Sequence, residues 1–274
     1  MRLETIRTTS GDRLTVNRGG VNFALQVPAN VSRALAEVGV DGVIEAAAAA
    51  TDVVTGDIVA PLRPSKVVAI GLNYLDHIRE TGMDRPERPL VFAKFPSSVI
   101  GPNEAIEIDP EISERVDWEV ELAVVIGTTA RRVSVDRALD HVFGYTVAND
   151  VSARDVQFSD GQWVRGKSLD TFCPLGPAVV TADDVPNPQA LRLSTMVNDR
   201  LVQDSSTSEM LFGVRELIAF CSRSFTLEPG DVVLTGTPWG CGEFMSPKQS
   251  LQPGDIVVCA VEGIGELRNP VRRS

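Results

Sequence analysis

Short apolar runs, separated by turns, dominate the hydrophobic pattern of this chain. Residues 67–70, 179–180, 232–234 and 256–258 are rich in Val and Ile, which is typical of buried strands. Seventeen prolines and 22 glycines punctuate the runs between them. The pattern therefore favours a β-rich α+β fold with short helices over a repeated βαβ unit.

The first 62 residues differ in character from the rest of the chain. Residues 14–17 and 21–27 alternate in polarity around Gly19-Gly20, which predicts a β-hairpin. Residues 31–38 and 42–50 predict two short helices, and the proline-rich run 61–64 is typical of a linker. We expect a small N-terminal α+β domain over residues 1–62 and a larger catalytic domain over residues 63–274.

Three carboxylates stand beside predicted buried strands. The segment Asp-Trp-Glu-Val-Glu at 117–121 runs directly into an apolar strand, so Glu119 and Glu121 share one of its faces. Asp150 stands just beyond a second apolar run, 142–148, after Asn149. Three such oxygens suit an octahedral Mg²⁺ or Mn²⁺ site. The alternatives are a solvated polar face for the glutamates and a helix N-cap for Asp150.

One histidine and one lysine are candidates for acid–base chemistry. Residues 75–81 predict a short helix that Gly82 ends. His77 and Glu80 lie three residues apart on it, so the carboxylate can orient the imidazole for activation of a water molecule. A surface ion pair is the alternative. Lys167 lies in a loop-rich segment, where it can stabilise an enolate or be an ordinary solvated lysine.

Composition narrows the classes of partner. The chain has 274 residues, of which 43% are hydrophobic, and a net charge of −11. The negative charge argues against nucleic acid or an anionic membrane as the main partner. No apolar run is long enough to span a bilayer, and the N-terminus lacks the apolar core of a signal peptide. We therefore expect a cytoplasmic protein whose four scattered cysteines are free thiols.

Seven ordered blocks give the chain a resemblance to the fumarylacetoacetate hydrolase family, especially to its smaller acylpyruvase-like, oxaloacetate decarboxylase-like and hydroxyhepta-dienedioate isomerase-like members. The resemblance covers roughly residues 66–272, and the order of the blocks makes it far more specific than any single block. The blocks are residues 71–80, 92–102, 117–127, 149–157, 166–177 and 234–240, followed by a C-terminal block that comprises 251–257 and 262–271.

The resemblance implies a mixed β-sandwich roll, a homodimer and one divalent cation per site, usually Mg²⁺, with Mn²⁺ or Ca²⁺ as alternatives. By position, Glu119, Glu121 and Asp150 match the metal ligands. His77 and Glu80 match a water-activating dyad in a lid-like helix, and Lys167 matches a lysine that faces the substrate. Gln157 and Thr237 match groups that contact the substrate's carboxylate end, and Arg154 is a further candidate for substrate binding.

The implied activity is hydrolysis of a C–C bond in a 2-oxo or 2,4-diketo acid such as an acylpyruvate, through an enolate. Decarboxylation of oxaloacetate and isomerisation of a hydroxy-dienoate are alternatives in the same site, and a non-catalytic binding protein is the alternative of another class. One departure affects substrate choice. After Pro238 the chain carries Trp239, Phe244 and Met245, which are bulkier or more apolar than the family's usual residues.

Overall fold

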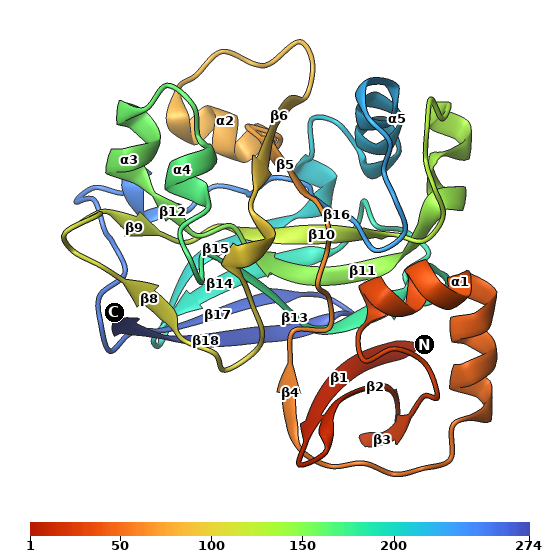
Figure 1. Cartoon of the computed structure of the whole chain (residues 1–274). Helices are drawn as coiled ribbons and strands as arrows, with labels where there is room; N and C mark the ends of the chain where they lie inside the picture. The colour runs from red at the N-terminus through yellow and green to blue at the C-terminus, as the bar shows by residue number, and fades with distance from the viewer.

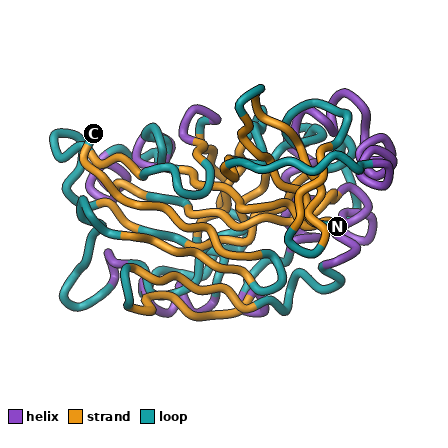
Figure 2. Tube along the Cα trace, turned by 90° about the horizontal axis from the view of Figure 1, so that it is seen from below, coloured by secondary structure: helices purple, strands orange, loops and turns teal.

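Two β-sheets packed face to face form the body of the protein. The computed structural model describes residues 1–274. Figure 1 shows the two sheets with short helices around them, and Figure 2 shows strands running through most of the molecule with helices at its periphery. All strand pairs are antiparallel except β16·β5, β13·β7 and β18·β8. The predicted β-rich α+β fold with a mixed sandwich is therefore confirmed.

The elements have the following bounds. The 11-stranded sheet runs in the order β3 (Val21–Ala24), β2 (Gly11–Arg18), β1 (Arg2–Thr8), β13 (Cys173–Thr181), β11 (Val142–Asn149), β10 (Val120–Ile126), β16 (Val232–Leu234), β5 (Val67–Gly71) and β6 (Leu90–Lys94), with β4 (Asp57–Val59) beside β1 and β7 (Val99–Ile100) beside β13. The five-stranded sheet runs in the order β15 (Arg200–Ser206), β14 (Arg192–Val197), β17 (Ile256–Val261), β18 (Gly265–Arg273) and β8 (Ile106–Ile108). A small sheet pairs β12 (Ser152–Ala153) with β9 (Val116–Asp117). The helices are α1 (Val31–Ala49), α2 (Leu75–Thr81), α3 (Arg154–Ser159), α4 (Val164–Lys167) and α5 (Val214–Ser224). Short 3₁₀ turns span Pro96–Ser98, Val135–His141, Ala182–Asp184, Thr207–Glu209 and Gly242–Phe244.

From Leu122 onward, strand β10 is apolar because both of its faces are buried. Leu122 and Val124 belong to the core of 37 residues that includes side chains of the five-stranded sheet. Ala123 and Val125 point the other way, into a second core of 24 residues that α1 helps to cover. A strand buried on both faces has no polar side to alternate with, which explains the continuous apolar run at 122–126.

The N-terminal region follows the sequence prediction closely. Gly19 and Gly20 both have positive φ and join β2 to β3, as the tight hairpin requires. Gly39, at φ 70° and ψ −178°, divides α1 at the predicted break between its two helical segments. Strand β1 pairs with β13, so the sheet continues from this region into the rest of the chain. The domain boundary at 62/63 stays a prediction.

The connections at one end of the 11-stranded sheet form the site. Helix α2 follows β5, while β12, α3 and α4 follow β11, and these three helices lie together in Figure 1. Gly82, at φ 65°, ends α2 at the predicted residue. The four cysteines are free and buried. None of the helices is long and apolar enough to cross a membrane.

Candidate active site

The three predicted carboxylate ligands converge at the ends of two neighbouring strands. Glu119 and Glu121 stand at the start of β10, and Asp150 directly follows β11, the antiparallel partner of β10. Oxygen atoms of the three side chains lie within 4.8 Å of one another, and all three residues are buried. The alternative role of Asp150 as an N-cap is wrong, because α3 begins after Ala153.

Three buried cations lie against these carboxylates. Lys167 Nζ donates to Glu119 Oε2 at 2.7 Å and to Asp150 Oδ2 at 2.8 Å. Lys94 Nζ donates to the other oxygen of Asp150 at 2.6 Å, and Arg154 Nη2 lies 2.6 Å from Glu119 Oε1. Burial alone would raise the pKa of Glu119, but the charges of Lys167 and Arg154 outweigh it and lower that pKa to about 2. Glu119 is therefore ionised at neutral pH.

Glu121 has no cationic partner in this arrangement. Its Oε2 accepts a single N–H, from Gly236 at 2.6 Å. Burial raises the pKa of Glu121 well above its usual value, and the charges of Asp150 and Glu119 raise it further. A cation bound by the three carboxylates would remove this penalty. Three buried oxygen donors with one unneutralised carboxylate thus fit a hard divalent cation.

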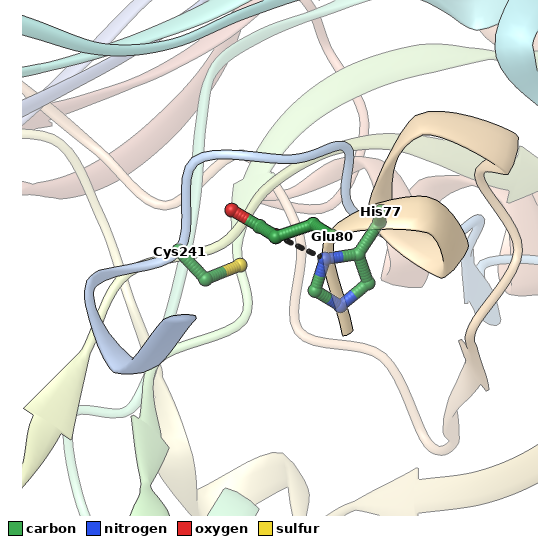
Figure 3. Close-up of side chains that lie close together, drawn as sticks. All are labelled: His77, Glu80 and Cys241. Atoms are coloured by element: carbon green, nitrogen blue, oxygen red, sulfur yellow. Dashed lines mark hydrogen bonds and ion pairs between the residues drawn. The ribbon is translucent and has the colours of Figure 1, made fainter. Parts of the chain in front are cut away.

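The His77–Glu80 pair forms as predicted, on α2. His77 Nδ1 lies 2.8 Å from Glu80 Oε2, and His77 is buried, so the pair is not a solvated surface ion pair. Figure 3 shows the two side chains meeting from one helix. Glu80 Oε1 also accepts the backbone N–H of Gly240 at 2.8 Å, which ties α2 to the loop after β16. A carboxylate acceptor requires Nδ1 to carry the proton, which leaves Nε2 free to act as a base.

A small cavity of about 40 Å³ connects these groups. Its polar lining includes every predicted catalytic or substrate-binding residue except Glu80: His77, Lys167, Arg154, Gln157 and Thr237. Gln157 Oε1 accepts from Arg154 Nη1 at 3.0 Å, and Thr237 Oγ1 accepts from Gln203 Nε2 at 3.0 Å. Glu119 also lines the cavity. The roles assigned to these side chains stay predictions.

Only one of the three unusual side chains after Pro238 borders the cavity. Phe244 lines it and packs edge-on against the His77 ring, with 5.4 Å between the ring centroids. Trp239 instead points outward, is 45% exposed and donates from Nε1 to the carbonyl of Asp204. Met245 packs against the core between the sheets. Of the three side chains, only Phe244 can therefore influence substrate choice by contact with the cavity.

Lys94 and Asp117 belong to the site, although no sequence pattern assigned them a role. Lys94 is only 1% exposed, and besides Asp150 its Nζ donates to the carbonyls of Val151 and Lys167. Asp117 accepts from Arg154 Nε at 2.9 Å and from the N–H of Gly242 at 2.8 Å. For Lys94 the available signal was a charged residue at the end of an otherwise apolar strand segment, since such residues are buried only when paired.

Comparison with known proteins identifies a family and several relatives that this chain resembles in sequence and in structure. The family model described as "Fumarylacetoacetate (FAA) hydrolase C-terminal" matches residues 66–272. The chain is 49% identical to "Oxaloacetate tautomerase fahd2, mitochondrial" of Xenopus laevis over 217 residues, which are 78% of this chain and 68% of that protein. It resembles the structure of a fumarylacetoacetate hydrolase from Exiguobacterium antarcticum, at a TM-score of 0.86 and 38% identity over the whole of both chains. A 5-carboxymethyl-2-hydroxymuconate delta-isomerase from Mycobacterium smegmatis matches at a TM-score of 0.82 and 36% identity, again over both whole chains.

Proposed function

Because the chain belongs to the fumarylacetoacetate hydrolase C-terminal family, we propose that it moves a proton between carbon and oxygen of a 2-oxo acid such as oxaloacetate. The reaction would interconvert the keto and enol forms and would consume no water. The observation that carries the proposal is the placement of His77 and Lys167 on one cavity, beside the carboxylates Glu119, Glu121 and Asp150. The tautomerase and isomerase names of the relatives describe chemistry of this kind.

The reaction needs a base at carbon and a proton donor at oxygen. His77 Nε2 would take a proton from the carbon next to the oxo group, with Glu80 holding the ring through Nδ1. Lys167 would donate a proton to the oxo oxygen. Burial opposes the charge on Lys167, but the carboxylates of Asp150 and Glu119 outweigh it and raise its pKa, so it is a cation at neutral pH. His77 gains the proton that carbon loses and Lys167 loses the proton that oxygen gains, and proton exchange with solvent then restores both side chains.

Substrate binding would use the polar wall of the cavity. Arg154, Gln157 and Thr237 supply donors for a substrate carboxylate. Mg²⁺ held by Glu119, Glu121 and Asp150 would act as a Lewis acid that polarises the oxygens of the 2-oxo acid. Phe244 and the Trp163 ring contribute apolar surface that limits the access of water to the reacting carbon.

Hydrolysis of an acylpyruvate is the second candidate, favoured by the apolar lining of the cavity. Its apolar wall includes Met83, Phe92, Phe158 and Trp163. Side chains of this kind suit the apolar part of an acyl group. In that reaction His77 would deprotonate water instead of carbon. Decarboxylation of oxaloacetate and isomerisation of a hydroxy-dienoate would use the same enolate.

The test is a substrate panel with matched variants. Purified protein with Mg²⁺ is assayed for the loss of enol-oxaloacetate absorbance, for acylpyruvate cleavage, for oxaloacetate decarboxylation and for dienoate isomerisation, each against a chelator control. We expect His77→Ala to lose on the order of 10²–10⁴-fold in kcat/KM for tautomerisation, as is usual for a general base. His141→Ala is the control, because His141 lies away from the cavity and contacts Thr128.

Each outcome selects one function. Acylpyruvate cleavage without catalysed tautomerisation would reject the first candidate and support the second. Full tautomerase activity in His77→Ala would remove the base assignment. Failure of every substrate with every divalent metal would favour a non-catalytic binding protein.

A further inference from the structure

Cys241 meets the His77–Glu80 pair beside the cavity. Figure 3 shows its thiol directed toward the two side chains from the loop that precedes the Gly242–Phe244 turn. One ligand atom from each of Cys241, His77 and Glu80 lies within 4.8 Å of the others. The Cys241 sulfur makes only long contacts of 3.9 Å, with the carbonyl of Pro238 and with Gln203. The proposed reaction leaves this thiol without a role.

We propose that Cys241, His77 and Glu80 form a second cation site that takes Zn²⁺ and uses none of the carboxylate ligands of the first site. One sulfur, one nitrogen and one oxygen donor are a typical set for zinc, whereas Mg²⁺ prefers oxygen donors alone. The cavity reaches the His77 ring, so an ion has a path from solvent and a water molecule can complete a tetrahedron.

The geometry requires only a small adjustment. Zinc bonds of about 2.0–2.3 Å place tetrahedral ligands roughly 3.3–3.8 Å apart. The three donors already lie within 4.8 Å of one another, so a side-chain rotation that moves the thiol by about an ångström closes the set. The His77–Glu80 hydrogen bond of 2.8 Å must open slightly to admit the ion.

Carboxylates outnumber cations around the thiol. Burial raises the pKa of Cys241 well above its usual value, the negative charges of Asp117 and Glu119 raise it further, and the positive charge of Arg154 opposes them. The free thiol is therefore protonated at neutral pH. On binding, the metal takes the sulfur lone pair and the thiol proton passes to solvent, while the Nδ1 proton of His77 moves to Nε2 so that Nδ1 can bind the ion.

Zinc at this site would inhibit the enzyme at saturating Mg²⁺. The ion would hold the imidazole of His77 and the carboxylate of Glu80, which the proposed reaction needs as its base. This consequence for activity rests on the proposed function. The binding of zinc does not rest on it, so the two can be tested separately.

The experiment measures binding first. Zn²⁺ is titrated by calorimetry into the full chain at saturating Mg²⁺, and Co²⁺ is used as a spectroscopic substitute that shows a thiolate charge-transfer band. We expect one Zn²⁺ per chain and a thiolate band in the wild type. Cys241→Val should lose the band and about 100-fold or more in zinc affinity, since changes to outer-shell partners alone cost 10–100-fold.

Matched variants separate loss of the thiol ligand from a general effect of substitution. Cys241→Ala is the second test variant, because alanine adds no volume to the buried site. Cys221→Ala, on α5, should keep both the band and the affinity. Glu121→Gln should also keep them, since it alters only the carboxylate site.

The proposal is overturned if the wild type shows no thiolate band, or if both Cys241 variants bind zinc as tightly as the wild type. If zinc inhibits the wild type but not Cys241→Ala, this result supports inhibition through binding of the His77 imidazole. A wild-type protein that binds zinc through Cys241 but turns over no substrate would refute the proposed function and leave the zinc site standing.

Discussion

Replacing Lys94 with methionine should destabilise the protein severely. Lys94 lies at the end of β6, is 1% exposed and donates to Asp150 Oδ1 at 2.6 Å and to the carbonyl of Val151 at 3.2 Å. Methionine fills similar space but leaves a buried carboxylate with one cation fewer and two carbonyl oxygens without this donor. Breaking a buried ion pair from one side costs about 3–5 kcal/mol.

The ion pair of Lys66 with the buried Asp231 supplies the matched control, because its lysine end is exposed. Lys66 Nζ lies 2.7 Å from Asp231 Oδ2, but the Lys66 side chain is 40% exposed. Asp231 also keeps hydrogen bonds from Ser65 and from two backbone N–H groups. Solvent screening limits the cost of Lys66→Met to about 1 kcal/mol or less.

Urea unfolding in metal-free buffer, followed by circular dichroism, measures both free energies of unfolding. We expect Lys94→Met to lose about 3 kcal/mol or more with an unchanged m value, against a total stability on the order of 5–15 kcal/mol. Equal losses in Lys94→Met and Lys66→Met would show that Lys94 does not neutralise Asp150.

Three further predictions concern the metal site and the assembly. Glu119→Ala, Glu121→Ala and Asp150→Ala should each weaken Mg²⁺ binding in calorimetry and keep the fold, and unchanged affinity in all three would remove the metal assignment. Because the folded-state pKa of Glu121 is raised, the metal-free protein loses stability as the pH rises from about 4.5 toward that pKa. Mg²⁺ displaces the proton, so it should raise the Tm more at pH 8 than at pH 6, and equal increments would contradict this. Light scattering under reducing conditions should show a homodimer, whereas a fully active monomer would speak against one.

The turns and helix ends could be predicted from the sequence because a few neighbouring residues determine them. Positive-φ glycines mark the β2–β3 hairpin and the end of α2 at the predicted residues, and Gly39 breaks α1 within the predicted gap between residues 38 and 42. The pairing of β1 with β13 could not be predicted, because it joins residues 176–178 positions apart through backbone hydrogen bonds that leave no periodic pattern in the sequence. For the same reason the sequence could not show that the first strands extend the sheet of the catalytic region.

The site was predictable where its residues follow strands or share a helix face. Glu119 and Glu121 were visible in a strand pattern, and His77 and Glu80 in helical spacing. Lys94 was missed because its partners come from the residues that follow β11 and from α4, far along the chain. The outward orientation of Trp239 could not be predicted either. It depends on a hydrogen bond from this loop side chain to the carbonyl of Asp204, which lies in β15.

The charges of the site indicate the order in which its ligands bind. Four buried carboxyl groups, Asp117, Glu119, Glu121 and Asp150, face three buried cations, Lys94, Arg154 and Lys167. Because the raised pKa of Glu121 keeps it protonated in the metal-free protein, these charges balance, and an anionic 2-oxo acid would gain no net attraction. A divalent cation displaces that proton and leaves one surplus positive charge, and Coulomb attraction is strong where solvent is excluded. The substrate should therefore bind after the metal, and a substrate-shaped anion such as oxalate should show no measurable binding in calorimetry until Mg²⁺ is present. Oxalate binding of equal strength with and without the metal would mean that Arg154 and Lys167 alone hold the anion.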